Sequence, residues 1–252
     1  ELKRRAELEL GKPIESVVCG RPVQFVDDDA KADAEAQRQL EGAVRAQGYR
    51  HVEFQFEPIA AALDYEQQVK KEELALVADI GGGTSDFTVI RLSPERARVV
   101  DRKADILATA GVHIGGTDFD RLLSLKKVMP LLGYGSETAD GQHPLPSGPY
   151  DDFATWHRIN RLYNAKTIAE LRSTVREARF PDLAAMMLAI VEDRAGHRLA
   201  GRVEEAKIAL SEADQTEFRF FTRDVPLQDT ITLRQLSQAI EAPTNAIATT
   251  IA

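Results

Sequence analysis

The chain has 252 residues, of which 43% are hydrophobic and 29% charged, and its formal net charge is −8 with a pI of about 5.3. This acidity excludes the basic surface typical of proteins that bind nucleic acids or anionic membranes. The length permits a sizeable core and favours two subdomains. The single cysteine, Cys19, excludes an internal disulfide and suits a reducing compartment, so we expect a cytoplasmic protein.

The first seventy residues alternate between helical and strand patterns. Acidic residues at 27–29 precede a helical stretch, and Pro58 falls in the first turn of another helix, where its missing N–H is harmless. The expected elements are a helix at 1–10, a mostly buried strand at 16–25, a helix at 30–48, a strand at 51–56 and a helix at 57–68. This order is typical of half of an α/β domain.

From Leu74 onward the pattern changes to successive strands and then to helices. The expected elements are strands at 74–80, 85–92 and 96–108, a helix at 115–132, a loop at 133–152, helices over 153–212 interrupted at Pro181, a strand at 216–225, and a helix at 233–240 capped by Thr232. Trp156 and Tyr163 lie seven residues apart, which predicts that both belong to the core. The five histidines have no metal-ligand spacing, so we expect no zinc site.

The segment "DIGGGTSD" (79–86) joins two of these strands. A tight turn can need positive φ, which glycine accepts, but three glycines in a row also let backbone N–H groups approach an anion. Thr84 adds a hydroxyl, and Asp79 adds a carboxylate able to hold Mg²⁺ through water. From these residues alone, a phosphate-binding turn and a plain glycine hairpin are equally good predictions. The lysine of a Walker loop is missing.

Three further segments accompany the glycine turn: "FEPIAAA" (56–62), "AGVHIGGTDFD" (110–120) and "EEAKIALS" (204–211). In this order, the four segments resemble the nucleotide-binding domain of DnaK-type heat-shock chaperones, within the superfamily of actin, sugar kinases and chaperone ATPases. The chain most resembles the divergent YegD-like branch. The resemblance covers about 10–121 and 202–240, whereas 122–201 do not match in detail.

The resemblance implies an α/β protein with part of the actin-like ATPase (ribonuclease H-like) fold and an inserted, mostly helical subdomain. We expect 1–72 to form the C-terminal part of a first lobe, 73–121 the core of a second lobe with the phosphate-binding turn, 122–235 the helical insertion, and 236–252 a truncated return helix.

The resemblance also implies a site for ATP or ADP with Mg²⁺, cradled between two lobes. It gives catalytic roles to Glu57, Asp79 and Thr84, with Asp79 reaching Mg²⁺ through water. The implied nucleotide contacts are Gly81, Gly82, Gly83, Thr84, Gly115, Gly116, Glu204, Lys207 and Ser211. Judged from the residues alone, Glu57 is better explained as a carboxylate favoured by a helix N-terminus, and a Glu–Lys pair three apart is common on helix surfaces.

Other family features have no counterpart in these residues. The family's first phosphate loop and the loop that closes over adenosine are missing, and Ile208 stands where the family has an arginine stacked on adenine. We therefore expect a fragment that carries part of the nucleotide site, binds Mg-ATP poorly and is inactive by itself.

On this resemblance, the sequence predicts a fragment of the nucleotide-binding domain of a DnaK-like chaperone whose parent hydrolyses ATP to ADP and phosphate. Partners would be nucleotide, and unfolded protein clients or co-chaperones, but neither nucleic acid nor membrane. The alternatives are a bacterial actin-like filament protein, a small-molecule kinase and a pseudo-ATPase that binds nucleotide without turnover. "EEAKIALS" favours the chaperone form over the filament form.

Overall fold

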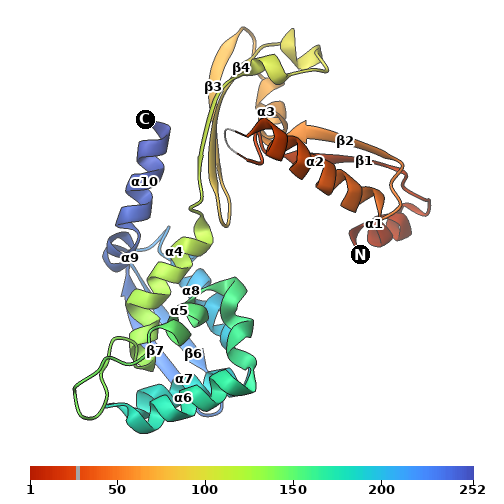
Figure 1. Ribbon diagram of the computed structural model, residues 1–252. Coiled ribbons are helices and arrows are strands. Elements are labelled where there is room, and N and C mark those ends of the chain that lie inside the picture. Colours follow the sequence, from red (N-terminus) through yellow and green to blue (C-terminus); the bar gives the residue numbers. More distant parts are fainter. Residues whose placement is uncertain (27–28) are drawn as a thin grey trace. The chain divides into compact units, whose positions relative to one another are not determined.

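The computed structural model describes residues 1–26 and 29–252, and the chain divides into two compact units (Figure 1). Unit 1 comprises Glu1–Asp79 and Asp86–Gly111, and unit 2 comprises Ile80–Ser85 and Val112–Ala252. The division into four segments expected from the sequence stays a prediction. Among the described residues, no helix has the length and apolar character needed to cross a membrane.

Unit 1 begins with helices and strands in the predicted order, but the mostly buried strand expected at 16–25 is wrong in its extent and burial, because β1 ends at Arg21 and alternates between exposed and half-buried residues. The elements are α1 (Leu2–Leu10), β1 (Ser16–Arg21), α2 (Ala30–Arg45), β2 (His51–Phe56) and α3 (Glu57–Glu66). Glycines with positive φ follow α1 and α2, at Gly11 (65°) and Gly48 (88°), where they allow the chain to leave a helix. The Asp29 side chain accepts from the amides of Lys31 and Ala32 at the start of α2, whereas Asp27 and Asp28 lie outside the described residues.

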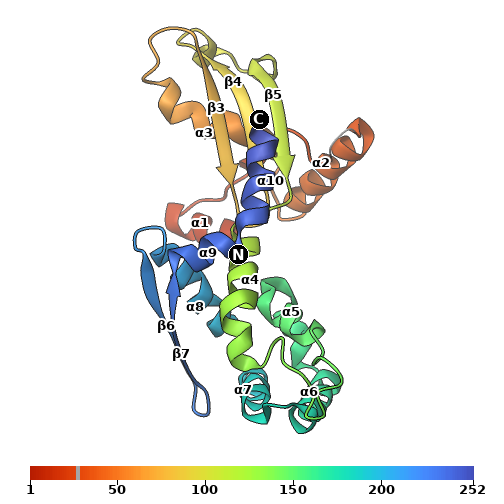
Figure 2. The same cartoon turned by 90° about the vertical axis from the view of Figure 1, so that its left-hand side faces the viewer.

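Two small sheets form the strand content of unit 1. β1 and β2 pair in parallel, in a register from Ser16↔His51 to Arg21↔Phe56. β3 (Glu73–Ile80), β4 (Ser85–Leu92) and β5 (Ile106–Val112) form a second sheet in the order β3-β4-β5 (Figure 2). The core of unit 1 gathers side chains from α3, from the residues after it and from the central strand β4: Ile59, Ala62, Val69, Ile90 and Leu92. This core holds the start of α3 close to the sheet.

The predicted strand at 96–108 is wrong over most of its length. Residues Arg96–Arg98 and Lys103–Asp105 form short 3-10 turns, and the strand begins only at Ile106. Asp105 is fully buried and accepts from Arg96 Nε at 2.5 Å and from Arg102 Nε. Arg102 also donates through both Nη atoms to Glu66, at 2.9 and 2.8 Å. Three charged residues of the segment, Arg96, Arg102 and Asp105, therefore pair in an ion cluster with Glu66 instead of lining one face of a strand.

Unit 2 is mainly helical, as predicted for most of its length. Its helices are α4 (Gly116–Leu123), α5 (Gly148–Ala154), α6 (Ala165–Glu177), α7 (Pro181–Glu192), α8 (Gly196–Ala209), α9 (Leu233–Ala239) and α10 (Glu241–Ile251). α4 continues as a π-helical turn (Ser124–Val128) and a 3-10 turn (Met129–Leu132), and another 3-10 helix spans Trp156–Tyr163. Pro130 cannot donate a backbone hydrogen bond, which accounts for the irregular end of α4.

An antiparallel hairpin completes unit 2. β6 (Gln215–Phe221) pairs with β7 (Pro226–Thr232), from Gln215↔Thr232 to Phe221↔Pro226. Thr232 caps α9 as predicted, because its Oγ1 accepts from the Gln235 amide at 3.3 Å while the Gln235 side chain accepts from the Thr232 amide at 3.0 Å. The sequence did not predict β7.

The core of unit 2 combines the helices with the hairpin. Its most buried members include Leu123, Met129, Tyr150, Met187, Ile190 and Phe218. α7 contributes the buried residues Ala184, Met187, Ile190 and Val191.

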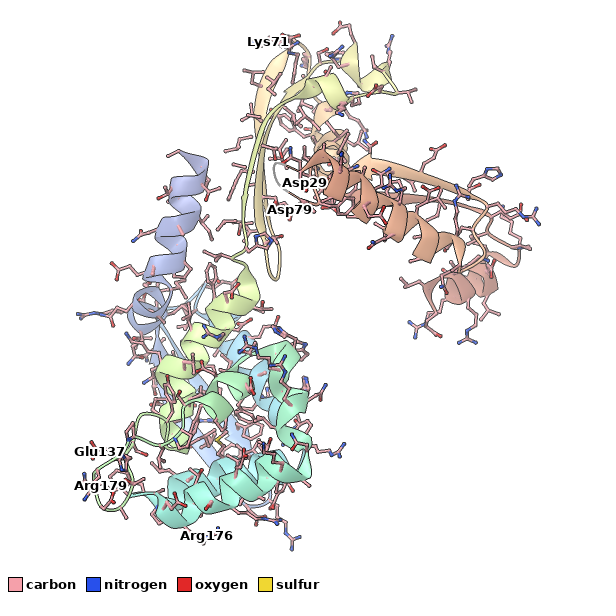
Figure 3. All side chains as sticks on the ribbon, viewed as in Figure 1. Asp29, Lys71, Asp79, Glu137, Arg176 and Arg179 are labelled. Carbon is pink, nitrogen blue, oxygen red and sulfur yellow. The ribbon has the colours of Figure 1, made fainter. Side chains whose placement is uncertain are left out.

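Two expectations for unit 2 are wrong. The loop expected at 133–152 ends earlier, because Gly148 and Pro149 are the first residues of α5. Within this loop, Glu137 Oε2 lies 3.5 Å from Arg179 Nη1 (Figure 3). Trp156 is 50% exposed rather than part of the core, since it sits at the start of a 3-10 helix whose buried residues are Ile159 and Leu162.

Candidate functional site

The glycine turn at 81–84 is fastened to the start of α4 by backbone hydrogen bonds. The Gly116 amide donates to the Gly81 carbonyl at 2.9 Å, and the Thr117 amide donates to the Gly82 carbonyl at 2.8 Å. Thr117 Oγ1 donates to the same Gly82 carbonyl at 2.6 Å. Two segments that are distant in the sequence therefore form one structure, as expected if both served one ligand.

Two amides of the turn, those of Gly82 and Gly83, remain available among the described residues. The Gly81 amide donates to the Thr84 carbonyl at 2.9 Å and closes the turn. Within the part of the chain that the structure describes, the Gly82 and Gly83 amides have no protein acceptor. Adjacent free N–H groups of this kind are what a phosphate group binds.

The fold itself does not require the glycines of the turn. The described glycines with positive φ are Gly11, Gly48, Gly133, Gly135 and Gly141, so the suggestion that this turn needs positive φ is wrong. A Cβ added at Gly82 would come no closer than 3.8 Å to the Thr117 side chain, and one added at Gly83 would meet nothing within 4 Å. The absent side chains leave open space beside the free amides.

The predicted pair Gly115 and Gly116 has a different role at each position. Gly115 is buried, and a Cβ there would lie 2.5 Å from both Gly82 C and Gly83 N, so this residue must be glycine for the two segments to pack. Its amide donates to Asp118 Oδ2 at 3.0 Å at the start of α4. Gly116 is half-buried, and its carbonyl accepts from Lys207 Nζ at 3.0 Å.

Lys207 links α8 to α4. Its Nζ lies 2.9 Å from Asp120 Oδ1, an ion pair without the geometry of a directed hydrogen bond. Burial raises the pKa of the Asp120 carboxyl, the Lys207 ammonium opposes this rise, and the charge of Glu204 adds to it. The structure thus brings Glu204, Lys207 and Gly116 together around Asp120.

The position of Ser211 differs from the prediction. α8 ends at Ala209, so Ser211 is not on the helix face that carries Glu204 and Lys207. Its amide donates to the Ile208 carbonyl at 3.0 Å in the following turn.

Sequence analysis missed Thr117 and Asp120. Thr117 fastens the glycine turn and Asp120 faces Lys207. Both belong to the quoted segment at 110–120, directly after the glycine pair. Their polar side chains at that place were the available signal.

The other predicted carboxylates lie in unit 1. Glu57 is the first residue of α3 and lies against β1, where a Cβ added at Gly20 would be 3.1 Å from Glu57 Oε1. The loss of solvent around the Glu57 carboxyl raises its pKa, and the charges of Asp79 and Asp86 raise it further. Asp79 is exposed near the end of β3 (Figure 3).

The carboxylates of unit 1 do not form a direct metal site by themselves. Across residues 1–26 and 29–252, no three His, Cys, Asp or Glu side chains are placed to hold a metal ion. The crowding of Glu57 by Asp79 and Asp86 nevertheless fits a nearby cation, which would reduce their mutual repulsion. The water-mediated contact from Asp79 to Mg²⁺ stays a prediction.

Comparisons with known proteins agree with these motifs. The family model described as Hsp70 protein matches residues 1–127. Three bacterial proteins named Chaperone protein DnaK are 34%, 35% and 37% identical to this chain over 125, 125 and 123 residues. They come from Elusimicrobium minutum (strain Pei191), Endomicrobium trichonymphae and Thermosipho africanus (strain TCF52B), respectively.

These matches extend over a limited part of the relatives. They cover 49%, 49% and 48% of this chain and, in each case, 18% of the relative's length. The matched region contains β1 to β5, the glycine turn and α4. The chain therefore belongs to the Hsp70 family and carries part of the actin-like ATPase fold of that family.

Proposed function

We propose that these residues form part of the ATP-binding and ATP-hydrolysing domain of a DnaK-type chaperone. One observation carries the proposal: the amides of Gly82 and Gly83 are free among the described residues, and nothing in the fold requires these positions to be glycine. A side chain there would instead obstruct a ligand that approaches the backbone. The β- and γ-phosphates of ATP are the ligand expected for such a turn in this family.

The remaining contacts in unit 2 follow from the same proposal. Gly81 and Thr84 complete the phosphate turn, and Gly116 lies at the N-terminus of α4, where the helix dipole favours an anion. Glu204 and Lys207 would contact the ribose and Ser211 the base. Lys207 already donates to the Gly116 carbonyl and pairs with Asp120, so it also fixes the distance between α8 and the phosphate turn.

In unit 1, Glu57 and Asp79 supply the carboxylates of the proposed reaction. Glu57 would orient the attacking water, and its raised pKa makes it a better proton acceptor than an ordinary glutamate. Asp79 would hold Mg²⁺ through water. When bound, Mg²⁺ would offset the negative charge of the phosphates. The expectation that Mg-ATP lies between two lobes stays a prediction.

The test is phosphate release from Mg-ATP by the complete protein that contains these residues, compared with its Glu57→Gln variant. We expect the variant to lose about a hundredfold or more of the turnover, as is usual when a positioned general base is removed. Glu53→Gln is the matched control, because Glu53 is an exposed carboxylate on the neighbouring strand β2. Equal turnover in all three proteins would remove Glu57 from the mechanism.

A second candidate is a nucleotide-binding protein without turnover. Ile208, which replaces the stacking arginine of the family, is 59% exposed and leaves the base without a cation–π contact at that place. Nucleotide binding measured by calorimetry, together with no phosphate release from the unmodified protein, would favour this candidate over the ATPase.

A further inference from the structure

A cavity of about 250 Å³ opens in unit 2 beside the phosphate turn. Its polar lining comes from Thr117 and Asp120 on α4 and from Glu204 on α8. Its apolar lining includes Ala200 and Val203 on α8 and the indole of Trp156. The cavity is large enough for a small organic molecule, and it has a charged part and an apolar part.

The charge of the cavity is negative. Asp120 and Glu204 contribute carboxylates, and no Lys, Arg or His is among the described residues that line it. Asp120 Oδ1 is hidden from solvent and receives no directed hydrogen bond, and the Lys207 ammonium beside it also serves the Gly116 carbonyl. Glu204 has no ion-pair partner within the described chain. The carboxylates of Asp120 and Glu204 thus have one ammonium, that of Lys207, between them, so one negative charge remains uncompensated beside the solvent-shielded Asp120 Oδ1.

Trp156 adds an aromatic wall with a fixed orientation. The indole is 50% exposed, and it packs edge-on against the His197 ring with centroids 4.8 Å apart and an interplanar angle of 83°. No cation of the described chain stacks on it. An aromatic face next to carboxylates is the arrangement that attracts organic cations.

We infer that this cavity binds a small organic cation, namely a primary ammonium group on a short alkyl chain. The ammonium donates to Asp120 and Glu204 and lies against Trp156, and the alkyl chain packs on Ala200 and Val203. This site shares Glu204 with the proposed ribose contacts, and its other lining residues lie outside the proposed nucleotide contacts. Thr117 connects the two, because it lines the cavity and also donates to the Gly82 carbonyl.

The single tryptophan of the chain provides a direct test. The indole N–H gives one cross-peak in a ¹⁵N-labelled sample, and it is followed without nucleotide during titration with n-butylammonium, 1-butanol and butyrate. We expect a saturable shift with n-butylammonium and no saturable shift with the neutral alcohol or the anion. An equal response to 1-butanol would reduce the cavity to a nonspecific apolar pocket, and no saturable response to the amine would overturn the inference.

Calorimetry of matched variants tests the carboxylate lining and the aromatic lining of the cavity separately. We expect Glu204→Gln and Trp156→Leu each to weaken n-butylammonium binding by about two- to fivefold. Glu205→Gln is the control, because Glu205 is an exposed neighbour paired with Arg202 and does not line the cavity. A loss of affinity in Glu205→Gln as large as that in Glu204→Gln would mean that only the general charge of α8 attracts the amine.

The same chemistry can come from a free amine or from a lysine side chain of a protein. Titration with the capped peptide Gly-Lys-Gly distinguishes the two sources. Binding as tight as that of n-butylammonium supports a lysine side chain as the occupant, whereas binding of the free amine alone supports a small molecule. Binding of neither the peptide nor the amine overturns the inference.

Discussion

Tyr150 illustrates how burial controls the chemistry of one residue. Its side chain is 1% exposed, its hydroxyl donates to the Leu132 carbonyl at 3.0 Å, and burial raises its pKa from 10.0 to about 12. Because folding raises the pKa of Tyr150, the neutral phenol contributes fully to the free energy of unfolding below pH 10. This contribution is lost as the pH rises through about 12.

We predict that Tyr150→Phe lowers the free energy of unfolding by about 1 kcal/mol, because the Leu132 carbonyl loses its donor. Urea unfolding at neutral pH measures this difference. Tyr134→Phe is the control, since Tyr134 is only half-buried and its ring lies 5.5 Å from that of Tyr150. A larger loss in Tyr134→Phe than in Tyr150→Phe would contradict the role of the hydrogen bond.

Two glycines of the candidate site should respond in opposite ways to the same substitution. Gly115→Ala should lower the free energy of unfolding by about 1–3 kcal/mol, because its Cβ would overlap the backbone of the glycine turn. Gly82→Ala should leave unfolding within about 0.5 kcal/mol of the unmodified protein but weaken ATP binding, because its Cβ fills the space beside the free amides. Unfolding curves and nucleotide titrations of both variants provide the measurement. Unchanged ATP binding in Gly82→Ala would argue against the phosphate turn.

At the scale of single residues, the sequence predicted which segments contain the candidate site residues but not which contact each residue makes. The glycine turn and the pair at 115 and 116 were found because their composition is unusual. That Gly115 packs under the backbone of Gly82, more than thirty positions earlier in the chain, could not be found in this way, since it depends on tertiary contact.

Among the elements, strands and helices with regular patterns were predicted well. β2 begins and ends where its alternation predicts, and Thr232 caps α9. The strand predicted over 96–105 is wrong because Arg102 and Asp105 turn inward and pair in a cluster with Arg96 and Glu66. Local periodicity does not reveal a partner thirty-six residues away.

The buried ion cluster gives a prediction for this segment. Arg102→Met should lower the free energy of unfolding by about 3–5 kcal/mol, because it leaves Glu66 and Asp105 buried with less compensating charge. Arg98→Met is the matched control, since Arg98 is exposed in the same segment. Denaturant unfolding of both variants measures the difference. Equal effects of the two substitutions would mean that the cluster does not contribute in this way.

At the scale of the whole molecule, each of the two units has a main hydrophobic core of its own among the described residues. Ile59 belongs to the core of unit 1 and Met187 to that of unit 2, and each is at most 1% exposed. Substitution of either by alanine should cost about 2–5 kcal/mol. We predict that faster amide hydrogen exchange, measured by mass spectrometry, stays within the unit that carries the substitution. Faster exchange throughout the chain in both variants would show that the units unfold together.

The order of the units along the chain also has a practical consequence. The polypeptide passes from one unit to the other after Asp79, after Ser85 and after Gly111. A protease cut just after Gly111 would therefore leave the glycine turn on the fragment that holds unit 1, apart from α4 and the rest of unit 2. Any gene built to express unit 1 by itself would splice Asp79 to Asp86 and delete the glycine turn. The proposed phosphate contacts must therefore be assayed in the undivided polypeptide.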